Sequence, residues 1–259
     1  RMPTLCGLRR RGYTPSAINE FVKKAGVAKA YSIVDIGLLE HCIRDELNTA
    51  AQRRVAVLHP VKVVITNYPE DKEEYFELPN IPKNEEAGVR KVPFTRELYI
   101  DADDFSLDPP PKYFRLKRDG YVRLKGAYII KCDDVLLNDD GTVKEILCSY
   151  IPESRSGDDT SGIKCKGTIH WVDADTAVDA EIRDYDYLLK DADYPGQDFS
   201  ERMNYDSIHI TKGKAEPYLN EVAKSTPFQL LRKGYYKTAR KDGALILSQI
   251  TAMKDSFKK

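Results

Sequence analysis

The hydrophobic pattern of this 259-residue chain changes its period near Arg54, and this change limits the folds that the chain can adopt. Before Arg54, apolar residues such as Leu39, Ile43 and Leu47 recur at the spacing of one helix face. After it come short β-type runs, separated by turn sequences such as NDDG at 138–141. Many short strands with regular turns favour barrels or sandwiches over a parallel α/β sheet. The sequence therefore predicts a mainly β fold with an N-terminal α-helical subdomain.

Two helices are predicted in the N-terminal part of the chain. Thr14 can cap the first helix, with Pro15 at its first position and Gly26 at its end. Ser32 is expected to begin the second helix, with Asp35 near the third position of a capping box. Both helices precede the first predicted strand.

The dipeptide Asp119-Gly120 predicts a hairpin, because it separates two β-type runs at 113–116 and 121–124. Strand alternation would place the cations of this region on one face and its apolar residues on the other. Aromatic side chains beside cations are suited to stacking on unpaired RNA bases. The cations are Arg115, Arg123 and Lys125, and the aromatic residues are Tyr113, Phe114 and Tyr121. The alternative interpretation is an ordinary half-buried strand with a soluble face.

The net charge of zero, from 41 basic and 41 acidic residues, hides an uneven distribution. Residues 1–30 carry seven cations against Glu20 alone, and residues 111–131 carry seven against Asp119 alone. Residues 153–200 are rich in aspartate instead. A polyanion responds to the local field and not to the total charge. The basic clusters are therefore compatible with nucleic acid, while a solvated mixed surface stays open as the alternative.

The sequence argues against several other classes of site. No apolar run approaches the roughly 20 residues that span a bilayer. The five cysteines and four histidines lack metal-ligand spacing, so free thiols and no metal site are expected, with Cys132 and Cys148 facing each other across a hairpin. The acidic residues Asp101, Asp103 and Asp104 are interpreted as a solvated turn and not as a cation site. No phosphate-binding glycine loop or convincing nucleophile–base arrangement occurs, so no catalytic residue is predicted.

Seven stretches, in order along nearly the whole chain, carry a family resemblance: RMPTLCGLRRRGY (1–13), LEHCIRD (39–45), VAVLHPVK (55–62), RKVPF (90–94), YVRLKGAY (121–128), KGTIHWV (166–172) and FQLLRKGY (228–235). Together they resemble the glutaminyl-tRNA synthetase family. The opening stretch is similar to the part that follows the ATP-binding catalytic half, and the chain begins with Arg1, so that half is expected to be missing. Glutamyl-tRNA synthetases of the archaeal and eukaryotic type share this architecture. A standalone β-barrel protein that binds ribosomal RNA is a further alternative.

The resemblance implies a helical connector followed by two β-barrels, with the distal barrel inserted in the proximal one. The connector would comprise residues 1–54. The proximal barrel would comprise 55–112 and 205–259, and the distal barrel 113–204. In the family, the connector contacts the inner corner of the tRNA and the barrels take the anticodon.

The resemblance also implies which residues read the anticodon. Arg53 resembles the contact to the middle base, with Gln229 and Arg232 as its partners from a late strand. Arg115 resembles the residue that reads the third base, a guanine, for which an arginine is a favourable bidentate partner.

Further contacts are implied at the first base and along the tRNA backbone. Arg123 and Lys125 resemble the pair at the first base, although the family can have arginine where Lys125 stands. Lys29 resembles a backbone contact. The run Arg9, Arg10 and Arg11 is open to two interpretations, a charged helix end or a set of phosphate contacts.

The resemblance implies that the parent enzyme joins glutamine to tRNA(Gln), using ATP with magnesium. The family's ATP-binding signatures are absent from this chain, so the chain by itself is expected to be catalytically inactive and to hold no cofactor. We expect tRNA(Gln) as the partner, no membrane contact, a monomer and a cytoplasmic location. Specificity for glutamine over glutamate is implied by the resemblance alone, because it resides in the catalytic half.

Overall fold

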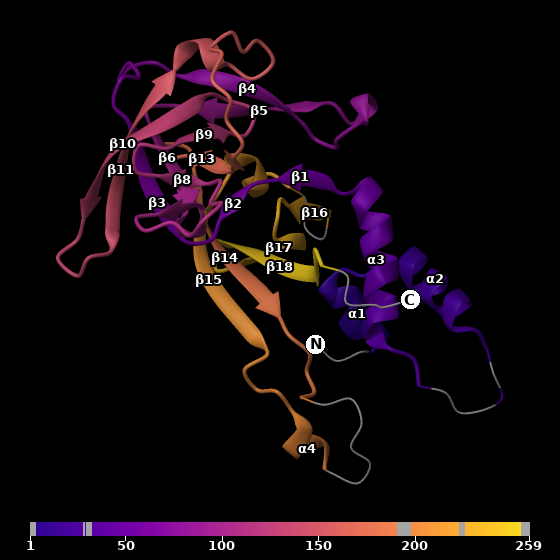
Figure 1. Ribbon diagram of the computed structural model, residues 1–259. Helices are drawn as coiled ribbons and strands as arrows, with labels where there is room; N and C mark the ends of the chain where they lie inside the picture. The colour runs from indigo at the N-terminus through magenta and orange to yellow at the C-terminus, as the bar shows by residue number, and fades with distance from the viewer. Residues whose placement is uncertain (1–3, 28, 30–32, 191–197, 223–225, 255–259) are drawn as a thin grey trace. The chain divides into compact units, whose positions relative to one another are not determined.

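A computed structural model of the chain shows a mainly β fold in which helices precede two nearly closed, barrel-shaped sheets (Figure 1). The fold class expected from the sequence is thereby confirmed. The structure describes residues 4–27, 29, 33–190, 198–222 and 226–254. The chain forms two compact units. The first unit comprises Arg1–Arg54, Glu181–Thr211 and Val222–Lys259, and the second unit comprises Val55–Ala180 and Lys212–Glu221.

The first unit begins with three helices, α1 (Leu5–Arg11), α2 (Pro15–Ala25) and α3 (Ile36–Ala50). Thr14 caps α2 by accepting a 3.2 Å hydrogen bond from the backbone nitrogen of Ala17, and Gly26 follows its last turn, as predicted. Asp35 is the N-cap of α3, because its carboxylate accepts a 2.8 Å bond from the backbone nitrogen of Gly37. The helix start expected at Ser32 lies outside the described residues, and Asp35 is the N-cap itself and not the third position of a capping box, because α3 begins at Ile36.

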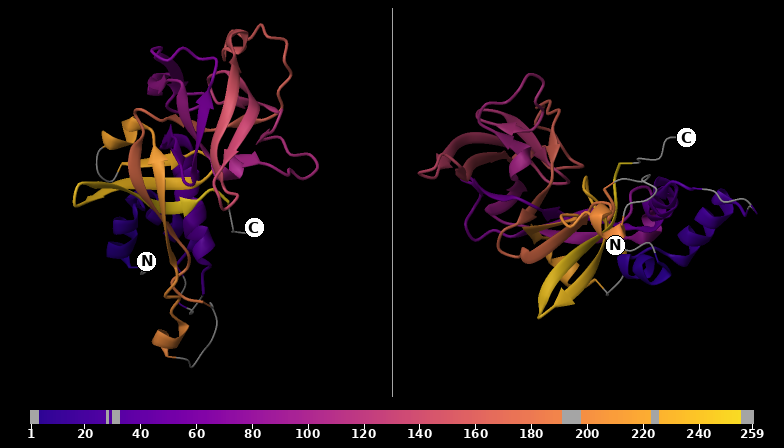
Figure 2. Two further views of the ribbon diagram at one scale, coloured as in Figure 1. Left: turned by 90° about the vertical axis from the view of Figure 1, so that its left-hand side faces the viewer. Right: turned by 90° about the horizontal axis from the view of Figure 1, so that it is seen from below.

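The sheet of the first unit has the strand order β1-β16-β17-β18-β14-β15, and β15 then pairs with β2 inside the second unit. The bounds are β1 (Gln52–Arg54), β2 (Ala56–Val57), β14 (Val178–Tyr185), β15 (Ile208–Ala215), β16 (Pro227–Leu230), β17 (Gly234–Lys241) and β18 (Ala244–Ala252), with the short helix α4 (Phe199–Arg202) between β14 and β15. Helices α1 and α3 lie beside β18 (Figure 2). Leu39, Ile43 and Leu47 of α3 pack with Tyr235 and Ile250, so the apolar helix face predicted from the sequence forms this core.

The sheet of the second unit has the order β12-β9-β10-β11-β3-β6-β13, with β4–β5 and β7–β8 as separate pairs. The bounds are β3 (Pro60–Ile65), β4 (Glu74–Pro79), β5 (Val89–Phe94), β6 (Glu97–Asp101), β7 (Phe105–Ser106), β8 (Leu116–Lys117), β9 (Tyr121–Leu124), β10 (Ile129–Leu137), β11 (Val143–Ile151), β12 (Thr168–Ile169) and β13 (Trp171–Asp173). One-turn 3-10 helices occupy Glu85–Ala87, Ala102–Asp104, Pro152–Ser154 and Pro217–Asn220. In the part of the chain that the structure describes, no helix is long and apolar enough to cross a membrane.

Aromatic rings fill the core of the second unit. The ring of Phe94 meets those of Tyr68 and Trp171 edge to face, with centroids 5.2 Å apart in each pair. Phe76 and Tyr128 approach Phe94 in the same way, at 5.4 and 5.7 Å. Edge-to-face packing suits rings whose faces are negative and whose edges are positive. The cluster joins residues from distant parts of the chain in one apolar core.

The observed units divide the chain differently from the expected barrels. Strand β3 pairs in parallel with β11 and antiparallel with β6, and β6 pairs with β13. These pairings place residues 55–112 with 113–180, whereas the sequence-based division placed 55–112 with 205–259. The expected division is the one that the family resemblance implies, and it was not read from strand patterns in this sequence.

The hairpin predicted around Asp119-Gly120 is wrong, although the turn itself is present. Gly120 donates to the carbonyl of Lys117 over 2.9 Å, and Asp119 has a φ of 56°. The flanking strands pair elsewhere, since β8 pairs with β7 and β9 pairs with β10 and β12. The reason is that the turn bonds to Cys132 of β10, which accepts from Asp119 and donates to Gly120.

The pairing expected for Cys132 and Cys148 is confirmed. The two residues are directly opposite each other in the antiparallel pair β10–β11, and both are fully buried. All five cysteines are free thiols in the structure.

Replacing Phe94 with alanine should destabilise the second unit strongly, because four ring contacts and a fully buried side chain are lost. We expect Phe94→Ala to lower the free energy of unfolding by about 3–5 kcal/mol. Trp171 is the only tryptophan and lies in this core, so its fluorescence during denaturant unfolding measures the effect. Phe114→Ala is the control, because that ring is 52 % exposed and its loss should change stability by about 0.5 kcal/mol or less. Equal losses in the two variants would contradict the role of the aromatic cluster.

Candidate nucleic-acid interface

In the first unit, strand pairing brings together Arg53 and Gln229. Strands β1 and β16 are parallel, and these two residues are register partners. Arg232 lies just beyond the end of β16, exposed, with a φ of 69°. Its neighbour Leu231 donates to the backbone carbonyl of Arg54 over 3.0 Å, which ties this turn to β1. The structure therefore places the three residues expected at the middle base around one strand pair.

The guanidinium of Arg53 caps the C-terminal end of α3. Its Nη2 donates to the carbonyl of Asn48 over 2.7 Å, and its Nη1 donates to the carbonyl of Ala51 over 2.5 Å. Carbonyl groups at a helix C-terminus carry partial negative charge and attract cations. Gln229 is only 4 % exposed, and its Nε2 lies 3.0 Å from the sulfur of Met253. Arg53 is therefore oriented by the helix end, while the side chain of Gln229 lies buried beside Met253.

In the second unit, Arg115 is exposed and held by one ion pair and one hydrogen bond. Its Nε lies 3.3 Å from Oδ1 of Asp104, and its Nη1 donates to the carbonyl of Asp103 over 2.6 Å. Arg115 occupies a bend directly before β8, so the expectation that it sits on a strand face was wrong. The same loop carries Phe114, whose ring is exposed and lies 5.6 Å from the ammonium of Lys166.

Strand β9 carries the alternation that the sequence predicted. Val122 and Leu124 are fully buried, whereas Arg123 is partly exposed and Lys125, directly after the strand, is exposed. The Nη1 of Arg123 donates to the carbonyl of Ser154 over 2.8 Å.

The other terminal nitrogen of Arg123 is paired with an acid. Its Nη2 forms an ion pair with the carboxylate of Asp159. Hydrogen bonds from Ser161, and then the nearby Arg123 guanidinium, lower the pKa of Asp159 below its usual value. The carboxylate therefore stays charged at neutral pH and fixes the orientation of Arg123.

Gly167 brings the loop of Arg115 close to Arg123. A Cβ atom at Gly167 would lie 1.6 Å from the carbonyl oxygen of Phe114, so only glycine permits this approach. The carbonyl of Gly167 in turn accepts a 2.9 Å bond from the backbone nitrogen of Arg123. Sequence reasoning missed this role, because a glycine before a short strand gives no sign of which segment it contacts.

Four of the seven cations between residues 111 and 131 form ion pairs with acidic side chains of the second unit. The pairs are Arg115–Asp104, Arg118–Asp134, Arg123–Asp159 and Lys131 with both Asp119 and Asp133. The positive potential of this cluster is therefore weaker than its composition indicated. Orientation of individual guanidinium groups matters more here than total charge.

The three arginines of α1 differ in their surroundings. The last turn of the helix contains Arg9, Arg10 and Arg11. A charged helix end was one of the two interpretations that the sequence left open. Arg9 and Arg10 are exposed. Arg11 is anchored, because its Nε donates to the carbonyl of Gln249 over 2.8 Å and its guanidinium lies 4.5 Å from the ring centre of Tyr185.

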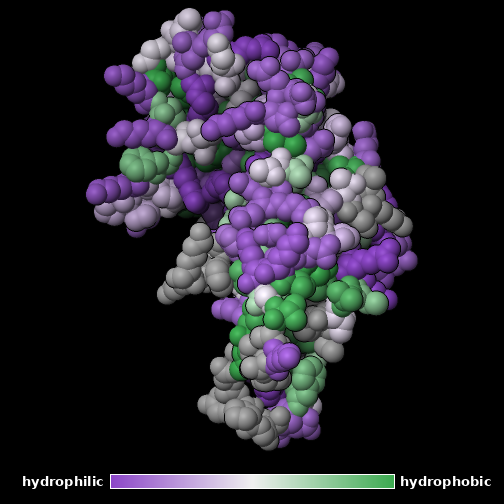
Figure 3. All heavy atoms as spheres, turned by 90° about the vertical axis from the view of Figure 1, so that its right-hand side faces the viewer, coloured by the Kyte–Doolittle hydropathy of each residue, from purple (hydrophilic) through white to green (hydrophobic). Residues whose placement is uncertain are grey.

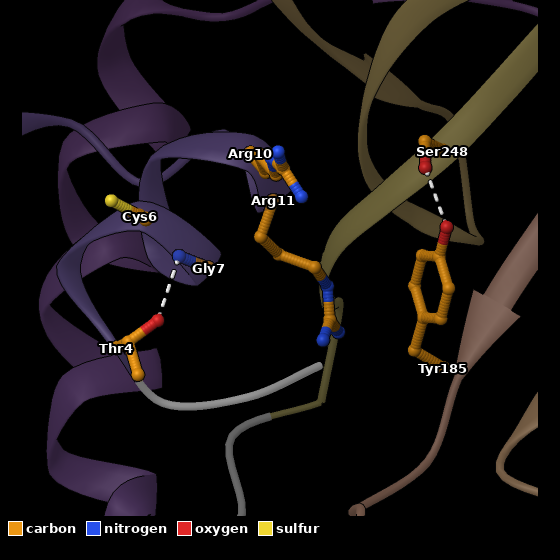
Figure 4. Close-up of a pocket in the computed structure, with 7 residues that line it drawn as sticks. All are labelled: Thr4, Cys6, Gly7, Arg10, Arg11, Tyr185 and Ser248. Carbon is orange, nitrogen blue, oxygen red and sulfur yellow. Dashed lines mark hydrogen bonds between the residues drawn. The ribbon is translucent and has the colours of Figure 1, made fainter.

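A pocket of about 350 Å³ opens between α1 and the neighbouring strands of the first unit (Figure 4). It is lined by Thr4, Cys6, Gly7, Arg10, Arg11, Tyr185 and Ser248. The hydroxyl groups of Tyr185 and Ser248 are 2.7 Å apart and fix the far wall. Two guanidinium groups and a phenol make this pocket suited to an anion.

Lys29 is exposed, but apolar side chains lie near it in the sequence. Figure 3 shows hydrophobic side chains gathered on the helical face of the first unit. Val27 and Ile33 are 97 % and 79 % exposed. An exposed apolar patch is typical of a surface that another protein segment covers. Lys29, Arg9 and Arg10 are all exposed, so each remains a candidate backbone contact.

Comparison with known proteins places this chain in a family. Residues 51–151 and 168–239 match two families that share the description "tRNA synthetases class I (E and Q), anti-codon binding domain". The chain belongs to this family of class I tRNA synthetase anticodon-binding domains. The matched segments include Arg53, Arg115, Arg123, Gln229 and Arg232.

Individual relatives are similar over the full length of the chain. The glutamine–tRNA ligase of Clostridium perfringens is 48 % identical across 100 % of this chain, which covers 48 % of that protein. The glutamine–tRNA ligases of Clostridium kluyveri and Rhodopirellula baltica are each 46 % identical across 100 % of the chain, which covers 48 % and 44 % of them. The chain thus spans about half the length of the curated relatives that it matches.

The anchoring of Arg11 predicts that neighbouring arginines have different effects on stability. Arg11→Ala removes a hydrogen bond and a cation–π contact, so it should lower the free energy of unfolding by about 1–2 kcal/mol. Arg10→Ala should change it by about 0.5 kcal/mol or less, because that side chain is exposed. Thermal unfolding followed by circular dichroism checks both variants. A larger loss for Arg10→Ala than for Arg11→Ala would contradict these contacts.

Proposed function

We propose that this chain binds tRNA(Gln) and reads its anticodon as part of a glutamine–tRNA ligase. The family supports the anticodon-binding role, and the names of the relatives support glutamine specificity. The observation that carries the proposal is the exposed guanidinium of Arg115, held by Asp103 and Asp104 beside the segment of Arg123. A guanidinium held in this way can donate two parallel hydrogen bonds to O6 and N7 of a guanine.

The proposed contacts are of two kinds, those to anticodon bases and those to the tRNA backbone. Arg53, Gln229 and Arg232 would surround the middle base in the first unit. Arg115 would read the third base, and Arg123 with Lys125 would contact the first base. Contacts to the backbone would come from Arg9, Arg10, Arg11 and Lys29, which position the tRNA without reading sequence.

The ligase reaction itself is proposed for a longer protein. ATP with magnesium would be used there, and this chain would supply tRNA recognition and no cofactor site. Among the described residues, no group of three histidine, cysteine, aspartate or glutamate side chains is placed to hold a metal ion. A monomer acting in the cytoplasm fits a protein whose partner is tRNA.

A glutamate–tRNA ligase is the second candidate, because the family description covers both E and Q synthetases. Binding of the chain to glutamine, glutamate and unrelated tRNAs, and to ribosomal RNA, separates the candidates. Preference for tRNA(Gln) supports the proposal. Preference for glutamate tRNA or for ribosomal RNA would replace it with the corresponding alternative.

Arg115→Ala should weaken binding to tRNA with guanine at the third anticodon base by about 1–3 kcal/mol, as for a lost bidentate pair. The penalty should shrink when that guanine is already replaced, because the arginine then has no partner. Binding of both proteins to both tRNAs forms a double-mutant cycle. Lys29→Ala serves as the comparison, since a phosphate contact should weaken both tRNAs equally. Full additivity between Arg115→Ala and the base replacement would show that Arg115 does not read this base.

Binding should also depend on salt despite the net charge of zero. Each phosphate contact should contribute roughly 0.7–0.9 to the negative slope of log affinity against log salt concentration. Arg10→Ala should reduce the magnitude of this slope by about one contact. Lys91→Ala is a matched control, because Lys91 is an exposed cation of β5 outside the candidate contacts. A slope near zero for the wild-type protein would show that the basic clusters are merely solvated.

A further inference from the structure

The side chain of Asp104 lies next to Arg115 because of strand register. Strands β7 and β8 pair in parallel, with Phe105 opposite Leu116. Asp104 and Arg115 come directly before these two residues, so the pair brings them side by side. Phe105 and Leu116 are 9 % and 0 % exposed and belong to the core of the second unit, which fixes the register.

The buried carboxylate of Asp104 requires a compensating partner such as the guanidinium of Arg115. The side chain of Asp104 is 1 % exposed, whereas that of Arg115 is 42 % exposed. Removing an ionised carboxylate from water is costly unless charged or polar partners compensate. The Nε of Arg115, 3.3 Å away, is such a partner. In this ion pair the acidic side chain is therefore buried and the basic side chain is exposed.

The contacts of Arg115 leave its outer edge available to a base. An arginine has five N–H donors in a planar fork. The Nε atom forms an ion pair with Asp104, and one N–H of Nη1 is donated to the carbonyl of Asp103. The remaining donors belong to the two terminal nitrogens, and one from each can form a bidentate pair with guanine.

A second acidic residue fixes the turn that presents these acceptors. Asp101 is 7 % exposed, and its carboxylate accepts 3.4 Å bonds from the backbone nitrogens of Asp103 and Leu58. It caps the one-turn helix Ala102–Asp104. The interpretation of this acidic run as a solvated turn was therefore wrong for Asp101 and Asp104, and only Asp103 has an exposed side chain.

We propose that Asp104 is a positioning residue for base recognition, holding the guanidinium of Arg115 in the orientation that pairs with guanine. This inference rests on the proposed function of the chain. A long side chain that is already oriented loses less conformational entropy when it binds. Asp104 therefore acts on discrimination between bases, although it touches no base itself. A purely structural carboxylate would instead weaken binding to all tRNAs alike.

The test compares the binding of two tRNAs that differ only in guanine or adenine at the third anticodon base. Asp104→Asn keeps the shape of the side chain but removes its charge. We expect the preference for guanine to fall roughly 10-fold, with little change in affinity for the adenine form. Asp103→Asn is the matched control, because Arg115 contacts only the backbone carbonyl of that residue. It should leave the preference unchanged.

A double variant tests whether Asp104 acts through Arg115. In an Arg115→Ala background, Asp104→Asn should have no further effect on the preference, because the group that it orients is gone. An undiminished effect in that background would overturn the inference. So would an equal loss of affinity for both tRNAs, which indicates a structural role.

Failure of the inference can be told apart from failure of the proposed function. If Arg115→Ala lowers the preference for guanine and Asp104→Asn does not, the positioning role is refuted and anticodon reading stands. If wild-type protein shows no preference for guanine at all, the proposed function fails with it.

A measurement on unbound wild-type protein keeps the inference testable if Asp104→Asn does not fold. The Nε–H signal of Arg115 in NMR spectra should exchange slowly with water, because its nitrogen is paired with the buried carboxylate of Asp104. The Nε–H signal of Arg118 is the comparison, since its ion pair with Asp134 is formed between two exposed side chains. Equally fast exchange at the two arginines would refute the positioning role.

Discussion

The aromatic cluster around Phe94 is the contact on which the rest of the second unit depends. It joins rings from β4, β5 and β13 with Tyr68 and Tyr128 from connecting segments. The indole nitrogen of Trp171 also donates to the backbone carbonyl of Lys125 over 3.1 Å. The same core therefore fixes the backbone directly after β9, where two of the candidate anticodon contacts lie. Rigid packing of this kind holds polar side chains in place more accurately than a loop could.

Three candidate base contacts share one structural setting, a very short parallel strand pair. Arg53 belongs to β1, which pairs in parallel with β16. Arg123 belongs to β9, which pairs in parallel with β12. Arg115 precedes β8, which pairs in parallel with β7. Parallel neighbours cannot be joined by a tight turn, so each pair connects separate segments of the chain. Arg115 and Arg123 have partners that are distant in sequence, whereas Arg53 donates to the end of the helix directly before it.

The sequence predicted those features that depend on neighbouring residues. The cap at Thr14 and the alternation along β9 are local, and both are found. The hairpin at Asp119-Gly120 was wrong because a turn does not determine which strands pair beside it. The buried state of Asp104 was missed for a similar reason, since its burial depends on the β7–β8 register. Family resemblance indicated the arginines, but not the groups that orient them.

The path of the chain has a consequence for how the protein responds to cleavage. The chain passes between the two units after residues 54, 180, 211 and 221, so the first unit consists of three separate segments and the second of two. Strand pairs hold these segments together, as β1 with β16 does in the first unit. A single protease cut in a surface loop would therefore nick the polypeptide without releasing an intact unit. Neither unit can be obtained by simple truncation, and each would have to be rebuilt with new connections between its segments.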